Sequence, residues 1–190
     1  AASAEKDGYE HFMLKEIHEQ PKVVKDTLNS LLHGGEIDFT EIGLTDGELE
    51  NINGIIIAGC GSAYHVGVVM QYVIEDLARV PVRVELASEL RYRNPVTCGE
   101  LLIVISQSGE TADSLAALRA AKERGLKTLA IVNVLGSSIA READKVIYTK
   151  AGPEISVATT KAYSTQLIAG YAFAVKLAKV KKTITDAYYS

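Results

Sequence analysis

The sequence predicts an α/β fold: a three-layer α/β/α sandwich around a five-stranded parallel sheet, preceded by N-terminal helices. The first observation is a series of short, continuously apolar runs, which are typical of strands buried on both faces. The second is that helix-length segments separate these runs, and this alternation favours a parallel sheet covered on both sides. We expect the flavodoxin-like strand order 2-1-3-4-5.

The N-terminal part of the chain has a helical pattern over residues 5–33. A break is expected where Gln20 meets Pro21, because proline suits the first turn of a second helix, here residues 22–32. We expect Gly34-Gly35 to end that helix. A polar connector then leads to the first strand.

Apolar runs and helical periodicity alternate through the rest of the chain. A run of about four to eight apolar residues predicts a buried strand, and a longer amphipathic stretch predicts a helix that stops before proline or at glycine, as at Pro81 and Gly125. In order, the predicted elements are a strand at 54–59, a helix at 62–78, strands at 82–86 and 101–105, a helix at 111–124, strands at 127–132 and 145–148, and a helix at 160–179.

The length of 190 residues suits one substantial domain and is too short for two large ones. We expect an N-terminal helical segment packing on the domain at residues 1–50, one α/β domain at 51–180, and the tail of a truncated chain at 181–190. Because the sequence has no initiator methionine, we expect it to be a piece of something longer.

The composition disfavours several classes of function. A net charge of -4 and a pI near 5.6 give no overall attraction to nucleic acid or to an anionic membrane. No apolar stretch approaches the roughly 20 residues of a membrane span, and no signal peptide is visible. Cys60 and Cys98 have neither CxxC spacing nor a His/Cys cluster, which argues against a structural zinc and a disulfide scaffold and suits a reducing cytoplasm. We expect no metal and no cofactor.

Two loops rich in small and hydroxyl residues follow the first and third predicted strands, at residues 59–64 and 106–111. The expected strand order brings both loops to the carboxyl edge of the sheet, where ligands bind in such folds. The second loop, Ser-Gln-Ser-Gly-Glu-Thr, opens a helix whose unpaired N–H groups attract anions. Its hydroxyls and glycine therefore predict a site for a phosphate monoester without a basic side chain. The alternative is that Ser106, Ser108 and Thr111 only cap the helix.

Other motifs are partial or have structural explanations. No Walker A pattern is present, which disfavours nucleotide hydrolysis. The Gly59-Cys-Gly61 turn resembles a dinucleotide fingerprint, but Tyr64 stands where glycine or alanine is required. His65 is interpreted as structural rather than as an acid or base. The Arg91-Tyr92-Arg93 cluster has acids around it, which favours an ion-pair network or a subunit contact over a nucleic-acid patch.

Glu154 lies in a Gly/Pro loop that leads into the last predicted helix. It is a candidate pocket acid, and the alternative is a solvent-facing acid beside a helix that Thr159 or Thr160 caps. Lys161 is interpreted as structural, because a cation at the start of a helix opposes the helix dipole unless it has a partner.

Six stretches together resemble the sugar isomerase (SIS) domain family and cover the chain from about residue 11 to 167. They are HFMLKEIHEQP, AGCGSAYHVG, ASELRYRNP, SQSGETADSLAALR, NVLGSSIARE and AGPEISVATTKAYSTQL. The stretch SQSGETADS by itself is only SIS-like. The stretches FMLKEIHEQP and ASELRYR resemble the first SIS half of the isomerase domain in glutamine–fructose-6-phosphate aminotransferases, which suggests hexosamine biosynthesis.

The resemblance implies contacts to fructose 6-phosphate or glucosamine 6-phosphate. The implied substrate-binding residues are Gly61, Ser62, Ala63, Ser106, Gln107, Ser108, Thr111, Val157 and Thr159, with residues 106, 107, 108 and 111 forming the phosphate cradle. Many family members have Thr-Ser where this chain has Ser62-Ala63, so one hydroxyl contact is lost or replaced by backbone. Thr159 stands where serine is common, which keeps the hydroxyl.

The resemblance also implies that the catalytic groups lie elsewhere. The family's Schiff-base lysine, proton-shuttling glutamate and ring-opening histidine belong to the second SIS half or the C-terminal tail, and no position here matches them. Cys60 is likewise not the glutaminase nucleophile. We expect no catalytic residue in this chain, and expect as partners a second SIS half, a glutaminase domain and, for the isolated chain, a second copy in a homodimer.

Two rival functions remain open from the sequence. One is a noncatalytic SIS module that senses a phosphosugar for a regulator, although the N-terminal segment is too short to supply a helix-turn-helix region. The other is a complete small SIS isomerase, which would convert its substrate without further domains.

Overall fold

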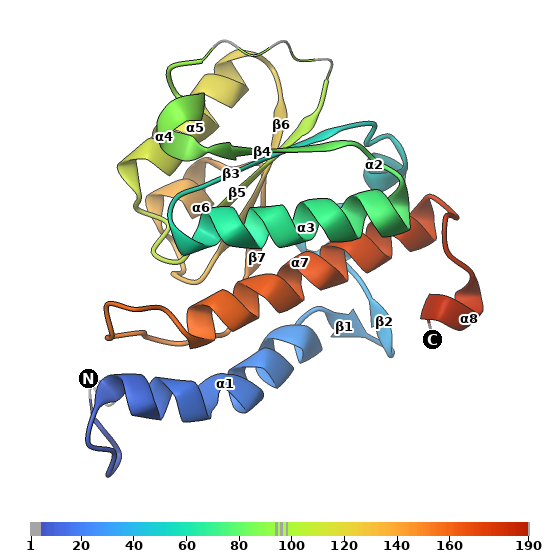
Figure 1. Cartoon of the computed structure of the whole chain (residues 1–190). Helices are drawn as coiled ribbons and strands as arrows, with labels where there is room; N and C mark the ends of the chain where they lie inside the picture. The colour runs from blue at the N-terminus through green and yellow to red at the C-terminus, as the bar shows by residue number, and fades with distance from the viewer. Residues whose placement is uncertain (1–4, 94, 96, 98, 190) are drawn as a thin grey trace.

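The computed structural model describes residues 5–93, 95, 97 and 99–189, so Cys98, one of the two cysteines considered above, lies outside the described residues. Its centre is a five-stranded parallel sheet in the order β4-β3-β5-β6-β7 (Figure 1). The strands are β3 (Ile55–Gly59), β4 (Val82–Leu86), β5 (Leu101–Ser106), β6 (Lys127–Val132) and β7 (Lys145–Tyr148). When the five strands of this sheet are counted from one to five along the chain, their order in the sheet is 2-1-3-4-5, as predicted. The predicted fold class is confirmed.

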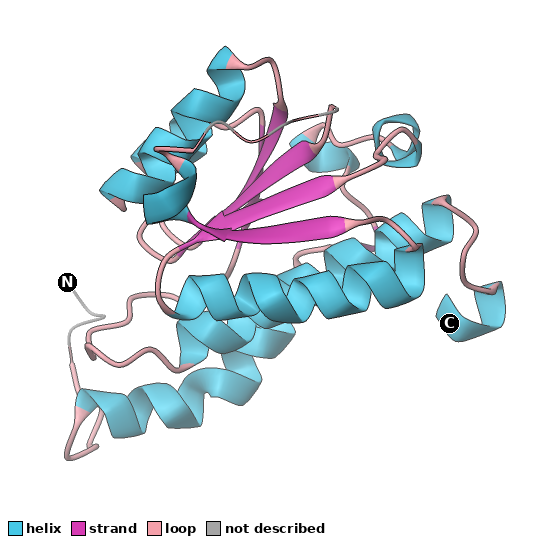
Figure 2. Cartoon of the chain, turned by 45° about the horizontal axis from the view of Figure 1, so that its top comes forward, coloured by secondary structure: helices cyan, strands magenta, loops and turns pink. Residues whose placement is uncertain are grey.

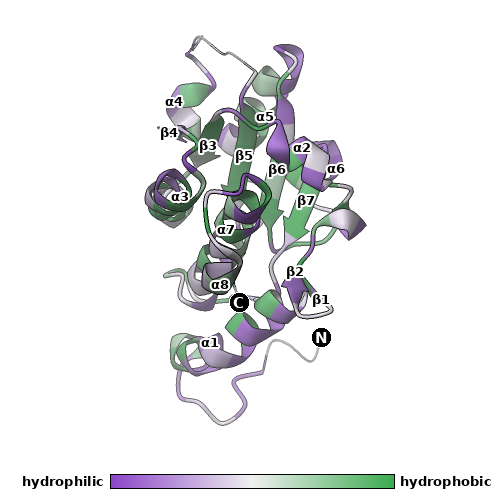
Figure 3. Ribbon diagram, turned by 90° about the vertical axis from the view of Figure 1, so that its right-hand side faces the viewer, coloured by the Kyte–Doolittle hydropathy of each residue, from purple (hydrophilic) through white to green (hydrophobic). Residues whose placement is uncertain are grey.

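Helices cover both faces of the sheet, because successive strand residues point to opposite sides (Figure 2). Ile55 and Ile57 share an apolar cluster with residues of α3 and α7. Ile56 and Ala58, between and after them, belong to a second cluster with α4, α5 and α6. These helices are α3 (Ser62–Ala78), α4 (Ala87–Leu90), α5 (Ala112–Glu123), α6 (Ser138–Glu142) and α7 (Lys161–Val180). Figure 3 shows the apolar strands in green between the more polar helices.

The N-terminal segment differs from the prediction at Pro21. Helix α1 (Phe12–Asn29) runs through this proline without a break. Proline cannot donate to the carbonyl of Ile17 four residues earlier, but the Gln20 side-chain amide donates to that oxygen at 3.2 Å. The neighbouring side chain thus replaces the missing backbone bond, and the predicted second helix over residues 22–32 is wrong.

The two glycines after α1 also have a different role. Gly34 and Gly35 form the turn of a short hairpin between β1 (Leu32–His33) and β2 (Glu36–Ile37), and both have positive φ. The connector that follows contains a 3-10 helix, η2 (Thr40–Ile42), and helix α2 (Asp46–Glu50). A capping box begins α2, where Thr45 and Glu48 each bond to the other's backbone N–H.

The N-terminal segment packs on the α7 side of the α/β part. Helix α1 lies against α7 as an outer layer (Figure 1), and Leu31, Phe39, Leu44 and Leu49 join the apolar cluster of that side. At the other end, α8 (Asp186–Tyr189) brings the Tyr189 hydroxyl to accept a 2.9 Å bond from the Ile37 N–H. Within the described ranges, no helix has the length and apolarity that a membrane span requires.

Candidate functional site

A cavity of about 250 Å³ lies at the carboxyl edge of the sheet, where β3 and β5 end. The amino ends of α3 and α7 lie at this same end of the molecule (Figure 1). Three separate segments line the cavity, namely Cys60, Ser62 and Ala63 from the first, Ile105, Ser106, Gln107, Ser108 and Thr111 from the second, and Glu154, Ser156, Val157, Thr159 and Gln166 from the third.

The structure therefore brings together all the predicted binding residues except Gly61, together with Glu154. Gly61 is the N-cap residue of α3, with φ 56° and ψ -129°, a backbone conformation that strongly favours glycine. Its place in the fold is the turn from β3 into the helix. His65 is exposed, contacts the Tyr64 ring edge-on and is absent from the cavity lining, in keeping with a structural interpretation.

Sequence reasoning missed four lining residues: Cys60, Ile105, Ser156 and Gln166. The first three directly precede predicted binding residues in the sequence. They would have been found if each loop had been predicted to line the site together with the residue before it. Gln166 lies in the second turn of α7. It falls within the family-like stretch AGPEISVATTKAYSTQL, but none of the predictions from the sequence assigns it a role.

The loop at residues 106–111 is organised by its own hydroxyls. The Ser106 Oγ accepts a 3.1 Å bond from the Gly109 N–H and lies 3.1 Å from the Thr111 Oγ1. The Ser108 Oγ accepts from the Glu110 N–H at 3.2 Å. Gly109 has φ +66°, and a Cβ there would lie 2.0 Å from the Ser137 Oγ, so this position requires glycine.

These hydroxyls do not cap α5. Thr111 occupies the N-cap position, but its side chain makes no capping hydrogen bond, and the two serines bond to N–H groups that precede the helix. The first-turn N–H groups of α5 have no intrahelical acceptor and remain available to an anion. Simple capping therefore does not account for the hydroxyls of this loop.

The charged groups around the start of α5 are paired with one another. Asp113 accepts a 2.6 Å bond from Arg91, which raises the pKa of that guanidinium. Arg93 bonds to both oxygens of Glu85, at 2.6 and 2.7 Å. The predicted ion-pair network around Arg91-Tyr92-Arg93 is thus confirmed. Among the described residues that line the cavity, none is lysine, arginine or histidine.

Glu110 ties the loop to helix α6. Its carboxylate accepts a 2.7 Å bond from the backbone N–H of Ser138, the first residue of α6. Hydrogen bonding to Ser138 holds the pKa of the Glu110 carboxyl below its ordinary value of 4.5. Because this acid faces α6, it supports the loop from outside the cavity.

Glu154 lines the cavity and also caps helix α7, a combination that neither interpretation of this residue anticipated. Its carboxylate accepts from the Thr159 hydroxyl at 2.8 Å and from the N–H groups of Thr160 and Ala162 at 3.1 and 3.0 Å. Thr160 is the N-cap residue by position but makes no side-chain capping bond. The predicted threonine cap is therefore wrong, because the glutamate in the preceding loop reaches the same N–H groups with a charged acceptor.

Helix α1 holds the outer wall of the cavity through buried charges. The Glu16 carboxylate, with the residue only 2% exposed, accepts from the backbone N–H of Ile155 at 2.6 Å and of Ser156 at 3.3 Å. Next to it, Lys161 is 4% exposed and bonds to Glu19 at 2.7 Å. Lys161 therefore has the partner that a cation at a helix start needs, and its structural interpretation is confirmed.

The described residues contain no group of three or more His, Cys, Asp or Glu side chains placed to hold a metal ion. Cys60 is a free, partly buried thiol whose Sγ lies 4.0 Å from the Ser114 Oγ. The cavity therefore offers a ligand mainly neutral donors and acceptors.

The model of the SIS domain family matches residues 48–176 of the chain. A glutamine–fructose-6-phosphate aminotransferase (isomerizing) of Clostridium tetani is 58% identical over 186 residues, which are 97% of this chain and 31% of that relative. The relative of the same name in Mycobacterium tuberculosis is 54% identical over 183 residues, or 96% of this chain and 29% of its own length. The chain thus spans about a third of the curated relatives it matches.

A solved structure gives the same result. The C-terminal domain of glucosamine-fructose-6-phosphate aminotransferase from Francisella tularensis superposes with a TM-score of 0.93 at 46% sequence identity. The match covers 98% of this chain and 52% of that one. The resemblance inferred from the six sequence stretches is confirmed.

Proposed function

Because the chain belongs to the SIS domain family, we propose that it is the sugar-phosphate-binding half of the isomerase domain of a glutamine–fructose-6-phosphate aminotransferase. Its ligand is then fructose 6-phosphate or glucosamine 6-phosphate. The observation that carries the proposal is the cavity at the carboxyl edge of the sheet, where neutral donors from three segments converge. The names of the relatives and of the Francisella tularensis domain support the choice of enzyme.

The phosphate group is placed at the loop 106–111 and the amino end of α5. Ser108 accepts a bond from the loop backbone, so its hydroxyl hydrogen is free to be donated. Ser106 and Thr111 bond to each other, which leaves one hydroxyl hydrogen of the pair for a ligand. These hydrogens and the first-turn N–H groups of α5 would surround a dianionic phosphate without any basic side chain.

The chemistry of isomerisation and amino transfer is assigned to other parts of the enzyme. Glu154 is engaged with the start of α7, and the nearby Lys161 is paired with Glu19. Neither is positioned as a free acid, base or nucleophile. We therefore assign this chain a binding role, with a second SIS half and a glutaminase domain as partners in the intact enzyme.

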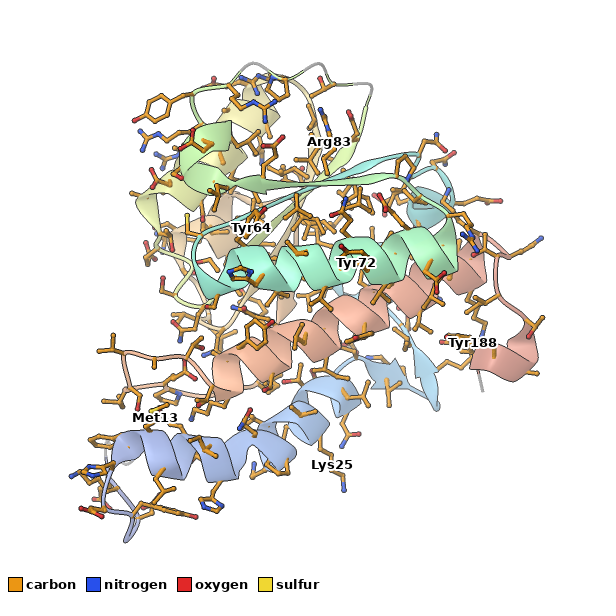
Figure 4. All side chains as sticks on the ribbon, viewed as in Figure 1. Met13, Lys25, Tyr64, Tyr72, Arg83 and Tyr188 are labelled. Atoms are coloured by element: carbon orange, nitrogen blue, oxygen red, sulfur yellow. The ribbon has the colours of Figure 1, made fainter. Side chains whose placement is uncertain are left out.

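A shallow groove supports the pairing with a second SIS half. It has a volume of about 530 Å³ and is lined by residues of α3 and α7 together with Tyr188. Tyr72 and Tyr188 are 72% and 62% exposed there (Figure 4), which leaves a large apolar surface for a partner. For the isolated chain, a homodimer through this groove is the corresponding proposal, and sedimentation equilibrium of the wild type against Tyr72→Ser tests it.

The division into residues 1–50, 51–180 and 181–190 and the cytoplasmic location stay predictions.

Calorimetric titration tests the binding function. Fructose 6-phosphate and glucosamine 6-phosphate should bind, and unphosphorylated fructose should not. Ser108→Ala should weaken both phosphorylated ligands by about fivefold, the equivalent of about 1 kcal/mol for one hydrogen bond. The matched control is Ser30→Ala, whose hydroxyl donates to the Thr27 carbonyl at the end of α1. Equal affinity for fructose, or an unchanged affinity in Ser108→Ala, would contradict the proposal.

An activity assay tests the assignment of the catalytic groups. The isolated chain should bind fructose 6-phosphate without converting it to an aldose phosphate. Measurable isomerisation by this chain would show that it carries a catalytic set of its own and is a complete isomerase.

A further inference from the structure

Gln166 carries an amide that lines the cavity and makes no hydrogen bond to any residue that the structure describes. The residue is 3% exposed and lines the cavity from the second turn of α7. Among the described residues, no side chain or backbone group makes a hydrogen bond to its amide. By contrast, the Gln71 amide donates to the Val82 carbonyl at 2.8 Å, and the Gln20 amide both donates to Ile17 and accepts from Ser164.

The fully buried unpartnered side-chain atoms of the described residues are the Ser137 Oγ and the Thr160 Oγ1, and the Gln166 amide is not among them. An amide that lines a cavity and has no protein partner can bond only to water or to a ligand there. Most buried polar side chains in proteins are satisfied, so an exception that faces a cavity indicates a group reserved for a ligand. The neighbouring Thr165 illustrates the difference, since its hydroxyl bonds to the Ala162 carbonyl within the same helix.

The chemistry of the amide indicates which end of the ligand it meets. A primary amide offers two N–H donors and one carbonyl acceptor, which match a hydroxyl group that also donates and accepts. A phosphate at neutral pH mainly accepts and would leave the amide oxygen facing negative charge. The hydroxyls at residues 106, 108 and 111 already supply donors for the phosphate.

We propose that Gln166 is a specificity-determining residue that hydrogen-bonds a hydroxyl of the sugar and thereby distinguishes a sugar phosphate from other phosphate monoesters. The proposal rests on the phosphosugar-binding function proposed above. It assigns the two ends of the ligand to different elements, the phosphate to the start of α5 and the sugar to α7.

Calorimetric titration with two probes, fructose 6-phosphate and inorganic phosphate, tests this assignment. Gln166→Leu should weaken fructose 6-phosphate by about five- to tenfold, as for one lost hydrogen bond. Its affinity for inorganic phosphate should stay within about twofold of the wild type. Ser108→Ala should weaken both probes. Gln166→Met, which keeps an unbranched side chain, serves if the leucine variant does not fold.

Stability without ligand gives a second readout, with Gln71→Met as the matched control. Replacing Gln71 leaves the Val82 carbonyl without its donor, so the free energy of unfolding should fall. Replacing Gln166 removes an unpaired amide, so the free energy of unfolding should stay equal or rise.

The outcomes separate the two proposals. If the wild type binds neither probe, the phosphosugar function itself is wrong. If Ser108→Ala weakens fructose 6-phosphate but the Gln166 variants do not, the function stands and the role of Gln166 is refuted. A Gln166 variant that weakens inorganic phosphate as strongly as fructose 6-phosphate also refutes it, because the amide would then not discriminate the sugar.

Discussion

Removing the Glu16 carboxylate should loosen the outer wall of the cavity, although Glu16 precedes the wall residue Ile155 by 139 positions in the sequence. Glu16 lies on α1, and its 2.6 Å bond to the Ile155 N–H is charge-assisted. In Glu16→Ala, this N–H and that of Ser156 lose their acceptor in a partly buried position. The loop at residues 153–159 then keeps the bonds of its own Glu154 to Thr159 and to the start of α7.

The magnitude follows from the two bonds. A hydrogen bond to a charged group contributes about 1.5–3 kcal/mol, and the 3.3 Å contacts of the Ser156 N–H add less. We expect Glu16→Ala to lower the free energy of unfolding by about 2–4 kcal/mol, which for a chain of this size is roughly 5–15 °C in Tm. Glu16→Gln keeps an acceptor oxygen without the charge, so it should lower the free energy of unfolding by only about 1 kcal/mol.

Urea denaturation followed by circular dichroism measures the stabilities, and amide hydrogen exchange measures the loop. Exchange at Ile155 and Ser156 should accelerate in Glu16→Ala more than exchange in the central strands. The control is Glu10→Ala, because the Glu10 side chain is 83% exposed and its loss should change stability by less than about 0.5 kcal/mol. If Glu16→Ala is as stable as this control and Ile155 exchanges at the wild-type rate, the reasoning fails.

Three further predictions concern the same end of the molecule. Glu19→Ala leaves the buried Lys161 ammonium without its partner and should lower the free energy of unfolding by about 3–5 kcal/mol, measured by urea denaturation. The control is Asp26→Ala, which breaks an exposed pair with Lys22 and should change the free energy of unfolding by less than about 1 kcal/mol. Gly109→Ala forces φ +66° on a residue with a Cβ against Ser137 and should reduce stability by about 1–3 kcal/mol while weakening phosphate binding in titration. The Glu110 carboxyl should titrate below 4.5 by NMR, so its contribution to stability is present above pH 4.5 and is lost as the pH falls through the lowered pKa; a midpoint at or above 4.5 contradicts this.

The sheet and its ligand-binding edge were predictable because they depend on local patterns. Continuous apolar runs such as residues 101–105 mark buried strands, and the hydroxyl-rich turn that follows marks the edge. The strand order was expected from the fold class, because 2-1-3-4-5 is one of the common orders of doubly wound parallel sheets. These signals lie within a few residues of one another, so one sequence is enough to read them.

The remaining features depend on contacts that no local pattern encodes. The helix continues through Pro21 because the Gln20 amide happens to reach the Ile17 carbonyl. The pairs Glu16–Ile155 and Glu19–Lys161 join positions 139 and 142 residues apart. Gln166 has no distinguishing pattern as a single helical residue, and only the folded chain shows that its amide lines the cavity without a hydrogen bond to another described residue.

The two walls of the cavity are held in different ways, and this has a consequence for ligand binding. The loop 106–111 is fixed by bonds within itself and by Glu110, so it keeps its shape without α1. The wall at 153–159 depends on Glu16 as well as on Glu154. A change in α1 should therefore leave the phosphate end of the site intact and disturb the sugar end. In titrations, Glu16→Ala should weaken fructose 6-phosphate more than inorganic phosphate, and equal weakening of both would show that the two walls are not independent.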